Sequence, residues 1–436
     1  MQFETLVING TVITVNADFD IIENGAVGVR GGRIDYVGPV SGVSVGDAVR
    51  VLDAEGGLIM PGLVNTHTHL PMSLFRGLAD DLDLDKWLNN HIFAAEKNHL
   101  SPETAKSGAL LSCAEMLLSG TTTCCDGYFF EDAVAEAVEQ AGLRAVLGQG
   151  IIDFPAPGVP DPEKNIEHAG DFIKKWKNRS TLITPSVFCH SPYTCSDTTL
   201  IRAKEIAKRE GVLFQVHLAE TRNEHDLIGL SKDITPVAYM DGLGVLDEKT
   251  LAVHAIWVNA ADIEILANRQ VGISHNPESN MKLASGIAPV HEMLAAGLAV
   301  GLGTDGNASN NNLDMFSEMG TVAKLHKVVR HDPTVIDAKC VIRMATIEGA
   351  RAIGLSEVTG SLETGKFADL IVIDTRKPHL FPLYHPQSHI VYSARGADVR
   401  HLMVAGNFLV EDSRLTKLDV NEIMDNVNAI AARIRR

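Results

Sequence analysis

The chain has 436 residues, of which 45% are apolar and 21% are charged, so it has the composition of a globular protein with a sizeable core. Its length exceeds that of one ordinary domain and suits one large barrel with a smaller unit attached. The net charge of −17 excludes the basic footprint that a nucleic-acid partner needs, and it disfavours docking on anionic membranes.

Targeting signals are not evident in this sequence. The first residues do not form a basic segment followed by an apolar one, and the longest apolar runs have strand length, far short of a membrane span. The six cysteines form no C-x-x-C pair, so we expect buried free thiols and not structural disulfides. These features predict a cytoplasmic protein that binds neither membranes nor nucleic acids.

The two ends of the chain are typical of β structure. Short runs rich in β-branched residues, separated by Gly and Asn, occupy residues 6–8, 12–15, 26–29 and 33–37. Similar runs occur at 369–374 and 401–407. Helical spacing of apolar residues follows from about 420 to 436. We therefore expect residues 1–58 and 368–436 to build one small β-sandwich domain with a C-terminal helix.

Between these ends, residues 59–367 alternate strand and helix patterns. Buried strands are expected at 62–70, 121–127, 144–151, 182–190, 213–220, 251–257, 271–277 and 299–306, with helices at 103–118, 132–140, 166–177, 199–210 and 289–296. Eight repeats of this alternation predict an α/β fold, a (β/α)8 TIM barrel. An open doubly wound sheet is the competing layout, but residues 301–306 lack the spacing of a phosphate-binding loop.

Four histidines and one aspartate lie where predicted strands end. The first strand ends in His67 and His69, two residues apart, so both imidazoles point to one side of a strand. The fifth strand ends around His217, the sixth at His254 and the eighth at Asp305. The carboxyl ends of barrel strands meet at one mouth, where active sites lie. One such histidine would suit a core or surface position, whereas the whole set indicates a catalytic centre.

These residue types in this pattern predict a metal site. His67, His69 and His217 offer three neutral nitrogens and Asp305 offers an oxygen, which leaves an open position on a catalytic ion for water. A second ion would need a bridging ligand, often a modified lysine on the fourth strand, and residues 182–190 contain no lysine. We therefore expect one divalent ion. The donor set suits zinc and tolerates iron or manganese.

Three groups are candidates for moving protons. Glu220 lies three residues after His217 and cannot point the same way along a regular strand, so we interpret it as a proton shuttle above the metal. His254 would hydrogen-bond the attacking hydroxide or the developing oxyanion. Asp305 would combine metal ligation with accepting a proton from the water.

Longer motifs around these residues make the chain resemble the amidohydrolase superfamily. They are PGLVNTHTH at 61–69, VHLAET at 216–221, SHNPESNMKLASG at 274–286, GLGTDGNASNN at 301–311 and GSLETGKFADL at 360–370. The resemblance runs nearly end to end, and the motifs are similar to those of the deaminase branch with mononuclear sites. Within it they resemble the 5′-methylthioadenosine/S-adenosylhomocysteine deaminase group, which shades into the triazine aminohydrolases and chlorohydrolases.

The resemblance implies hydrolytic deamination. Water activated at the metal attacks an amino-bearing ring carbon, C6 in adenine, while Glu220 carries a proton to the ring nitrogen. Asp305 and His254 help to remove the second proton, and ammonia leaves from a tetrahedral intermediate. The expected products are ammonia and the inosine analogue of the nucleoside.

Three further positions are candidate substrate contacts, and two of them, His190 and Glu96, are so by analogy with the family. His190 follows the fourth strand, where the family places a histidine that faces the nucleoside. Glu96 lies where it places an acid on the ribose, and a carboxylate can accept hydrogen bonds from both hydroxyls of a cis-diol. Trp87 would stack on the purine or on the thioether end. The alternatives are a surface acid at a helix start for Glu96 and a loop anchor for Trp87.

One departure from the family bears on the substrate. The Pro-rich segment 153–162 lacks the arginine with which some relatives hold a substrate carboxylate, and Arg144 and Arg179 precede their strands, away from the mouth. S-adenosylhomocysteine carries such a carboxylate and methylthioadenosine does not. Methylthioadenosine is therefore the first expected substrate, followed by adenosine and S-adenosylhomocysteine.

Other interpretations stay open. Guanine deaminases and triazine aminohydrolases or chlorohydrolases belong to the same branch. A phosphate-ester hydrolase with two metals is disfavoured by the missing lysine, and a non-catalytic barrel scaffold conflicts with the intact set of candidate residues. The sequence gives no oligomeric state, although an amphipathic tail is compatible with a homo-oligomer.

Overall fold

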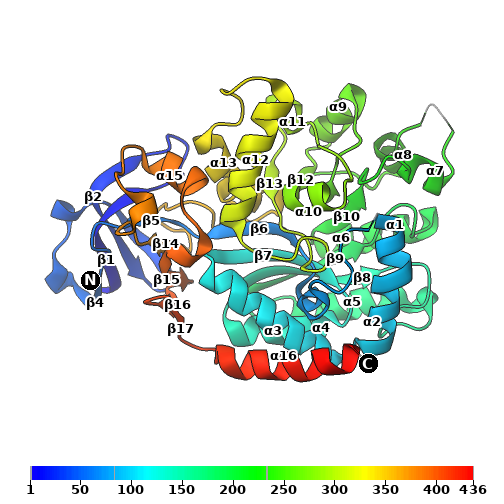
Figure 1. The fold of residues 1–436 in the computed structure, drawn as a ribbon, viewed down its shortest axis with the longest axis horizontal. Helices are drawn as coiled ribbons and strands as arrows, with labels where there is room; N and C mark the ends of the chain where they lie inside the picture. Colours follow the sequence, from blue (N-terminus) through cyan, green and yellow to red (C-terminus); the bar gives the residue numbers. More distant parts are fainter. Residues whose placement is uncertain (1, 83, 232–233, 436) are drawn as a thin grey trace.

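Eight parallel strands form the barrel of the computed structural model, which describes residues 2–82, 84–231 and 234–435 (Figure 1). Neighbouring strands follow one another in chain order, as right-handed β–α crossovers require. The predicted (β/α)8 barrel is confirmed, and its strands are β6 (Leu63–Thr68), β7 (Thr121–Tyr128), β8 (Arg144–Ile151), β9 (Ile183–Cys189), β10 (Phe214–Leu218), β11 (Thr250–His254), β12 (Gly272–His275) and β13 (Val300–Leu302).

The first and last strands of the barrel lie side by side. Just past the end of β13, the backbone N–H of Asp305 donates to the carbonyl oxygen of His67 at 3.0 Å. The N–H of Thr304 donates to Asn65 Oδ1, also at 3.0 Å. β6, β7 and β8 are buried along their whole length, as expected for strands covered on both faces. The closure therefore joins the two strand ends that carry His67 and Asp305.

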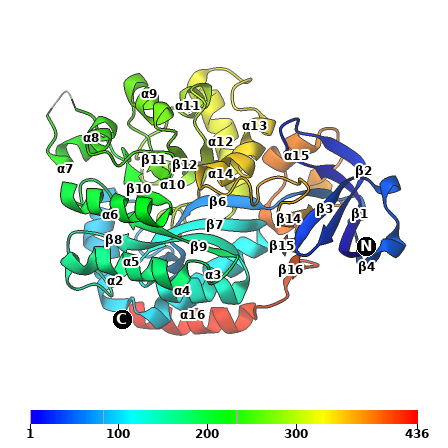
Figure 2. The same ribbon diagram turned by 180° about the vertical axis from the view of Figure 1, so that it is seen from behind.

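Helices surround the barrel on its outer side (Figure 2). Ser101 and Ser196 cap α3 and α6 by accepting from the backbone N–H three residues on. The helices predicted from apolar periodicity are present as α3 (Pro102–Leu118), α4 (Glu131–Ala141), α5 (Asn165–Trp176), α6 (Asp197–Glu210) and α11 (Val290–Ala295). Shorter or later helices are α1 (Leu84–Lys86), α2 (Phe93–His99), α7 (Glu224–Ile228), α8 (Pro236–Gly242), α9 (Ala260–Asn268), α10 (Pro277–Lys282), α12 (Met315–Arg330), α13 (Ala338–Met344), α14 (Ile347–Ala352) and α15 (Pro386–Tyr392).

Both ends of the chain contribute to a second, nine-stranded sheet, which confirms the predicted small β domain. Its strands are β1 (Phe3–Ile13), β2 (Ile21–Arg30), β3 (Arg33–Pro39), β4 (Ala48–Asp53) and β5 (Leu58–Pro61), with β14 (Leu370–Ile373), β15 (Val399–Val404), β16 (Asn407–Glu411) and β17 (Arg414–Leu415). β14 pairs antiparallel with β5 and so joins the two ends. Strands from both ends enclose one apolar cluster, which includes Val7, Ile59 and Met403. The domain boundaries at 58/59 and 367/368 stay a prediction.

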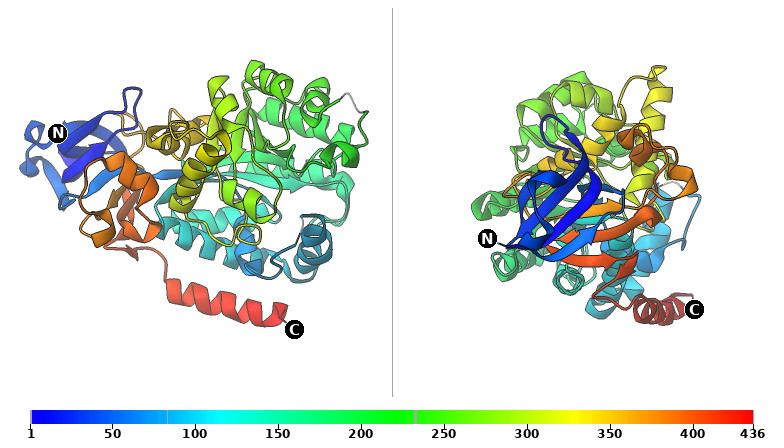
Figure 3. Two further views of the ribbon diagram at one scale, coloured as in Figure 1. Left: turned by 45° about the horizontal axis from the view of Figure 1, so that its top comes forward. Right: turned by 90° about the vertical axis from the view of Figure 1, so that its left-hand side faces the viewer.

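An ion pair and a helix tie the ends of the chain to the barrel. At the start of β8, Arg144 donates to the buried carboxylate of Asp369, with Nε–Oδ2 at 2.7 Å and Nη2–Oδ1 at 3.1 Å. The predicted C-terminal helix is present as α16 (Val420–Ile434), which runs along α3 with Val427 and Ile430 buried (Figure 3). Among the described residues, every helix falls short of the length and apolar character that crossing a membrane demands.

Candidate metal centre and active site

Four side chains converge at the carboxyl ends of the barrel strands. His67 Nε2 lies 3.2 Å from His217 Nε2, and Asp305 Oδ1 lies 3.4 Å from the Nε2 atoms of both His67 and His69. The ligand atoms of the three histidines lie within 4.8 Å of one another. His69 Nδ1 donates to the carbonyl of Gly127 at 2.7 Å, which turns its Nε2 toward this centre. The structure thus brings the predicted ligands together.

This donor set fits a divalent cation. All four side chains are buried. Burial lowers the pKa of His67 to about 4 and lowers that of His217 well below its usual value, so both rings are neutral at physiological pH. Burial acts to raise the pKa of Asp305, but the neighbouring histidines hold it well below its usual value. Neutral imidazoles around one anionic oxygen are the donors of a metal site.

Left-handed backbone conformations mark three of the strand ends. They occur at Ala219 (φ 54°), His254 (φ 73°) and Asp305 (φ 64°), where a side chain makes such a conformation uncommon. The turn at Ala219 redirects the chain just after β10 ends. Glu220 therefore lines the same cavity as His217, although the alternation of a regular strand would separate them.

Glu220 and His254 form a pair beside the metal ligands. His254 Nε2 lies 3.8 Å from Glu220 Oε1. His254 Nδ1 donates to Asn280 Oδ1 at 2.8 Å, which leaves Nε2 for the cavity. Burial raises the pKa of Glu220 above its usual value. An upward shift brings the pKa of a carboxyl group closer to the range in which it can both take up and release a proton.

Several polar residues that hold these groups have no role in the sequence analysis. Ser279 and Ser309 donate to Asp305 Oδ2 at 2.7 and 2.8 Å, so Oδ1 is left toward the histidines. Asn280 orients His254 in the same way. These residues lie within motifs 274–286 and 301–311, which was the available signal. Their partners depend on loop geometry, which spacing along the chain does not give.

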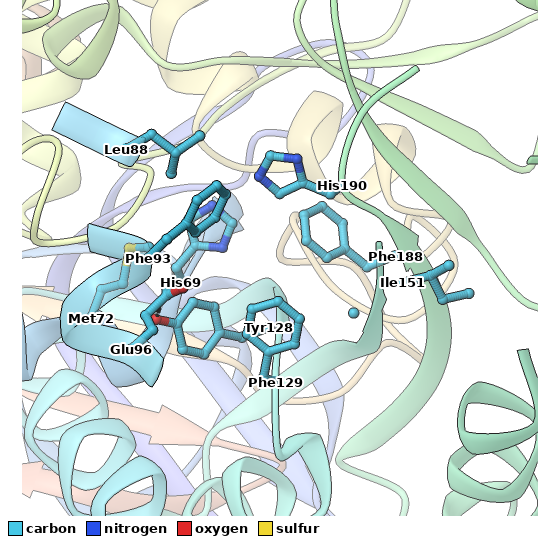
Figure 4. A pocket seen from close by; sticks show the side chains of 11 residues that line it. His69, Met72, Leu88, Phe93, Glu96, Tyr128, Phe129, Ile151, Phe188 and His190 are labelled. Carbon is cyan, nitrogen blue, oxygen red and sulfur yellow. Dashed lines mark hydrogen bonds between the residues drawn. The ribbon is translucent and has the colours of Figure 1, made fainter. Parts of the chain in front are cut away.

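The site opens into a cleft with two lobes that share part of their lining. The lining of the metal lobe includes His217, Glu220, His254 and Asp305. The second lobe is largely apolar, and Figure 4 shows its aromatic side chains. These are Phe93, Tyr128, Phe129 and Phe188.

The three predicted substrate contacts line this cleft. Glu96 is buried in the apolar lobe, where it accepts a hydrogen bond from the Tyr128 hydroxyl (Figure 4). Burial raises the pKa of Glu96 to about 7, although the Tyr128 hydrogen bond opposes the shift. Trp87 is buried in the wall of the metal lobe, in the π-helical turn η4 (Trp87–Ile92), and His190 lines both lobes. Glu96 is therefore not a surface acid, and the three roles in substrate binding stay predictions.

Among the described residues, no lysine or arginine lines either lobe. Arg144 is engaged with Asp369 at the opposite end of β8. The Arg179 guanidinium lies over the ring of Trp176, 4.5 Å from its centroid. Neither arginine lines the cleft, in agreement with the sequence analysis.

Residues 58–409 match the amidohydrolase family. The chain is an amidohydrolase. The matched range takes in the whole barrel, with every candidate ligand and proton carrier, and continues into the C-terminal strands. The resemblance inferred from the motifs is thereby confirmed, and the protein is a hydrolase of the class that acts on carbon–nitrogen bonds.

Relatives of this amidohydrolase share its full length. A protein of Syntrophobacter fumaroxidans named 5-methylthioadenosine/S-adenosylhomocysteine deaminase is 47% identical over 433 residues, which cover 99% of this chain and 98% of the relative. A 5'-deoxyadenosine deaminase of Methanothermobacter thermautotrophicus is 45% identical over 438 residues, which cover 100% of both. The crystal structure of an adenosine deaminase from Xanthomonas campestris with bound zinc has a TM-score of 0.96 and 36% identity, and covers 100% of this chain and 99% of the other.

Proposed function

We propose that this amidohydrolase is a hydrolytic deaminase of adenine nucleosides with an uncharged 5′ group, such as 5′-methylthioadenosine or 5′-deoxyadenosine. The observation that carries the proposal is the two-lobed cleft. In it a metal site with two proton carriers adjoins an apolar lobe that holds one buried carboxyl group. The purine then occupies the metal lobe, and the 5′ group occupies the apolar lobe. The names of the full-length relatives support the same reaction.

In this proposal His67, His69, His217 and Asp305 hold one zinc ion. Bound there, the ion would act as a Lewis acid and lower the pKa of a water molecule. The choice of zinc is supported by the nitrogen and oxygen donors and by the zinc in the Xanthomonas campestris structure.

The protein's own side chains move two protons in the proposed reaction. Glu220 takes the first from the attacking water and delivers it to the ring nitrogen, which makes the neighbouring carbon more electrophilic. His254 and Asp305 transfer the second from the new C–O–H group to the amino group, which leaves as ammonia. The carbonyl and the protonated ring nitrogen of the inosine analogue remain. The 3.8 Å between His254 Nε2 and Glu220 Oε1 supports these roles, because two groups this close could both reach one reacting carbon.

In this proposal the three predicted substrate contacts bind the nucleoside. Glu96 would accept hydrogen bonds from both ribose hydroxyls. Trp87 would pack against the ring system, and His190 would face the nucleoside between the lobes. The lining of the described cleft contains no cation, which supports an uncharged 5′ group over the carboxylate of S-adenosylhomocysteine. A homo-oligomeric state and a cytoplasmic location stay predictions.

Ammonia release from a substrate panel, with metal content measured on the same sample, tests the proposal. The panel holds methylthioadenosine, 5′-deoxyadenosine, adenosine, S-adenosylhomocysteine, adenine, guanine and a triazine. We expect fast release from the first two compounds, slower release from S-adenosylhomocysteine, and one zinc ion per chain. Release from guanine or the triazine alone would contradict the proposal and favour the alternatives of the same branch.

A further inference from the structure

The segment that carries Glu220 is held by an unusual backbone turn. β10 ends at Leu218, and Ala219 then adopts the left-handed conformation. This turn brings Glu220 into the metal lobe. Because it also ends the strand ladder, the backbone N–H groups of Ala219 and Glu220 need partners other than a neighbouring strand.

One buried carboxylate satisfies both N–H groups. Glu224 Oε1 accepts from the N–H of Ala219 at 2.8 Å, and Glu224 Oε2 accepts from the N–H of Glu220 at 2.9 Å. Glu224 is fully buried, at 0% exposure, and it begins the short helix α7. Burial raises the pKa of Glu224 to about 8, while the hydrogen bonds from the two N–H groups act to lower it. The position of this buried carboxyl group is therefore closely tied to these two N–H groups.

The other side of the turn is fastened to the strand end that carries His254. Leu218 O accepts from the N–H of Ala255 at 3.0 Å. Ala219 O accepts from the N–H groups of Ile256 and Trp257 at 3.0 and 2.9 Å. The Glu224 carboxylate thus binds the N–H groups of the turn, and the segment after His254 binds its carbonyl groups. Together these bonds fix Glu220 relative to His254.

We propose that Glu224 is a positioning residue for the proton shuttle: its carboxylate holds the Ala219 turn so that Glu220 faces the reacting atoms beside His254. The inference rests on the proposed function, because it takes Glu220 as the shuttle. Glu224 itself touches neither the metal ligands nor the substrate cleft.

Glu224→Gln is the informative variant because glutamine has the same shape but one acceptor fewer. Its amide oxygen can accept from one N–H, while its NH₂ group faces the other N–H donor, so one of the two hydrogen bonds to the turn is lost. We call these two hydrogen bonds the clamp. We expect kcat per bound zinc to fall roughly 10- to 100-fold, as for a misplaced catalytic group, with KM nearly unchanged. Asp226→Asn, an exposed position on the same helix, is the matched control and should keep the wild-type rate.

A double-variant cycle separates positioning from general damage. If Glu224 acts through Glu220, then Glu220→Gln/Glu224→Gln should be no slower than Glu220→Gln alone in single-turnover assays. Multiplied losses in the double variant, or a loss in Glu224→Gln that merely follows lost zinc, would overturn the proposal. If the glutamine variant does not fold, Glu224→Asp replaces it, since its shorter side chain cannot reach both N–H groups.

A crystal structure of Glu224→Gln tests the clamp without any activity. We expect the Ala219 turn to relax and the Glu220 carboxylate to move away from His254. An unchanged turn, with the Glu220–His254 distance still at 3.8 Å, would refute the positioning role. Wild-type protein that released no ammonia from any nucleoside would instead refute the proposed function, and the crystallographic comparison would still decide on the clamp.

Discussion

Three residues of the reaction centre have a strained backbone, as do other residues elsewhere along the chain. Ala219, His254 and Asp305 adopt left-handed conformations that cost on the order of 1 to 3 kcal/mol each for residues with a side chain. They persist because surrounding bonds fix them, as the Asp305 N–H is fixed by the carbonyl of His67. The directions of Glu220, His254 and Asp305 are thus set by the backbone before substrate arrives. Such preorganisation is what lets fixed groups stabilise developing charge.

Glu220→Gln tests the proton shuttle directly. The variant keeps the shape of the side chain and all metal ligands but cannot carry a proton. We expect zinc content to stay at the wild-type level while kcat falls by several orders of magnitude, on the order of 10³-fold. Metal analysis and ammonia release measure the two quantities. Glu205→Gln, an exposed position on α6, should behave as wild type, and near wild-type turnover in Glu220→Gln would disprove the mechanism.

Burial raises the pKa of Glu96 to about 7, so the proposed role of Glu96 in ribose binding predicts a pH dependence of known sign. Below this pKa the carboxyl is protonated and is a poorer acceptor for the ribose hydroxyls. We therefore expect the KM for nucleosides to fall as pH rises from about 6 to 8, with no matching change for free adenine. Steady-state kinetics on both compounds check this, and equal profiles would remove Glu96 from the sugar site.

Tyr128→Phe sharpens that test. The Tyr128 hydroxyl donates to Glu96 and acts to lower its pKa, against the larger effect of burial. Without this bond the pKa of Glu96 should rise, so the fall in nucleoside KM should occur at higher pH than in wild type. A profile unmoved by Tyr128→Phe would contradict the coupling.

At the scale of elements, periodicity predicts the strands well and the loops poorly. The eight barrel strands are short buried segments that alternate with helical segments, so the barrel follows from the pattern. His67 and His69 share a side because a strand repeats every two residues. The turn at Ala219 and the π-helical turn that carries Trp87 depend on tertiary contacts, so the local sequence pattern does not predict them. The hydrogen bonds from this turn to Glu224 could not be predicted from the sequence for the same reason.

His67→Ala tests whether the strand ends form one metal site. His67 lies on β6 between the carboxylate of Asp305 and the imidazole of His217, so its loss removes the shared neighbour of both. We expect zinc to be lost and turnover to disappear. The exposed His168 on α5 offers a matched control, since His168→Ala should keep both. A fully metallated, active His67→Ala protein would rule out the ligand assignment.

At the scale of the whole molecule, the barrel and the terminal sheet are joined by a buried charge pair. Arg144 belongs to barrel strand β8, and Asp369 directly precedes β14 of the terminal sheet. Asp369 Oδ1 also accepts from the N–H of Ala405 at 2.7 Å. The Asp369 carboxylate in the GSLETGKFADL motif thus has a structural role far from the metal.

Asp369→Ala should destabilise the protein without changing the chemistry. Removing one partner of a buried ion pair leaves the other charged and unpaired, which costs about 3 to 5 kcal/mol. We expect urea unfolding at a lower midpoint and an unchanged kcat per zinc for the folded fraction. Asp171→Asn, which breaks an exposed pair with Lys174, is the control and should shift stability by no more than about 0.5 kcal/mol. Equal effects of the two substitutions would contradict the role of Asp369.

The pairing of β5 with β14 has a consequence for biosynthesis. Residue 370 leaves the ribosome roughly 15 to 60 s after residue 61, at about 5 to 20 residues per second. Throughout that interval the apolar edge of β5 has no partner, while the entire barrel is being made. An unpaired strand edge is a template for association with other chains. The yield of folded protein should therefore depend on chaperone protection of the nascent N-terminal strands, a demand imposed by the order of the chain and invisible in the finished fold.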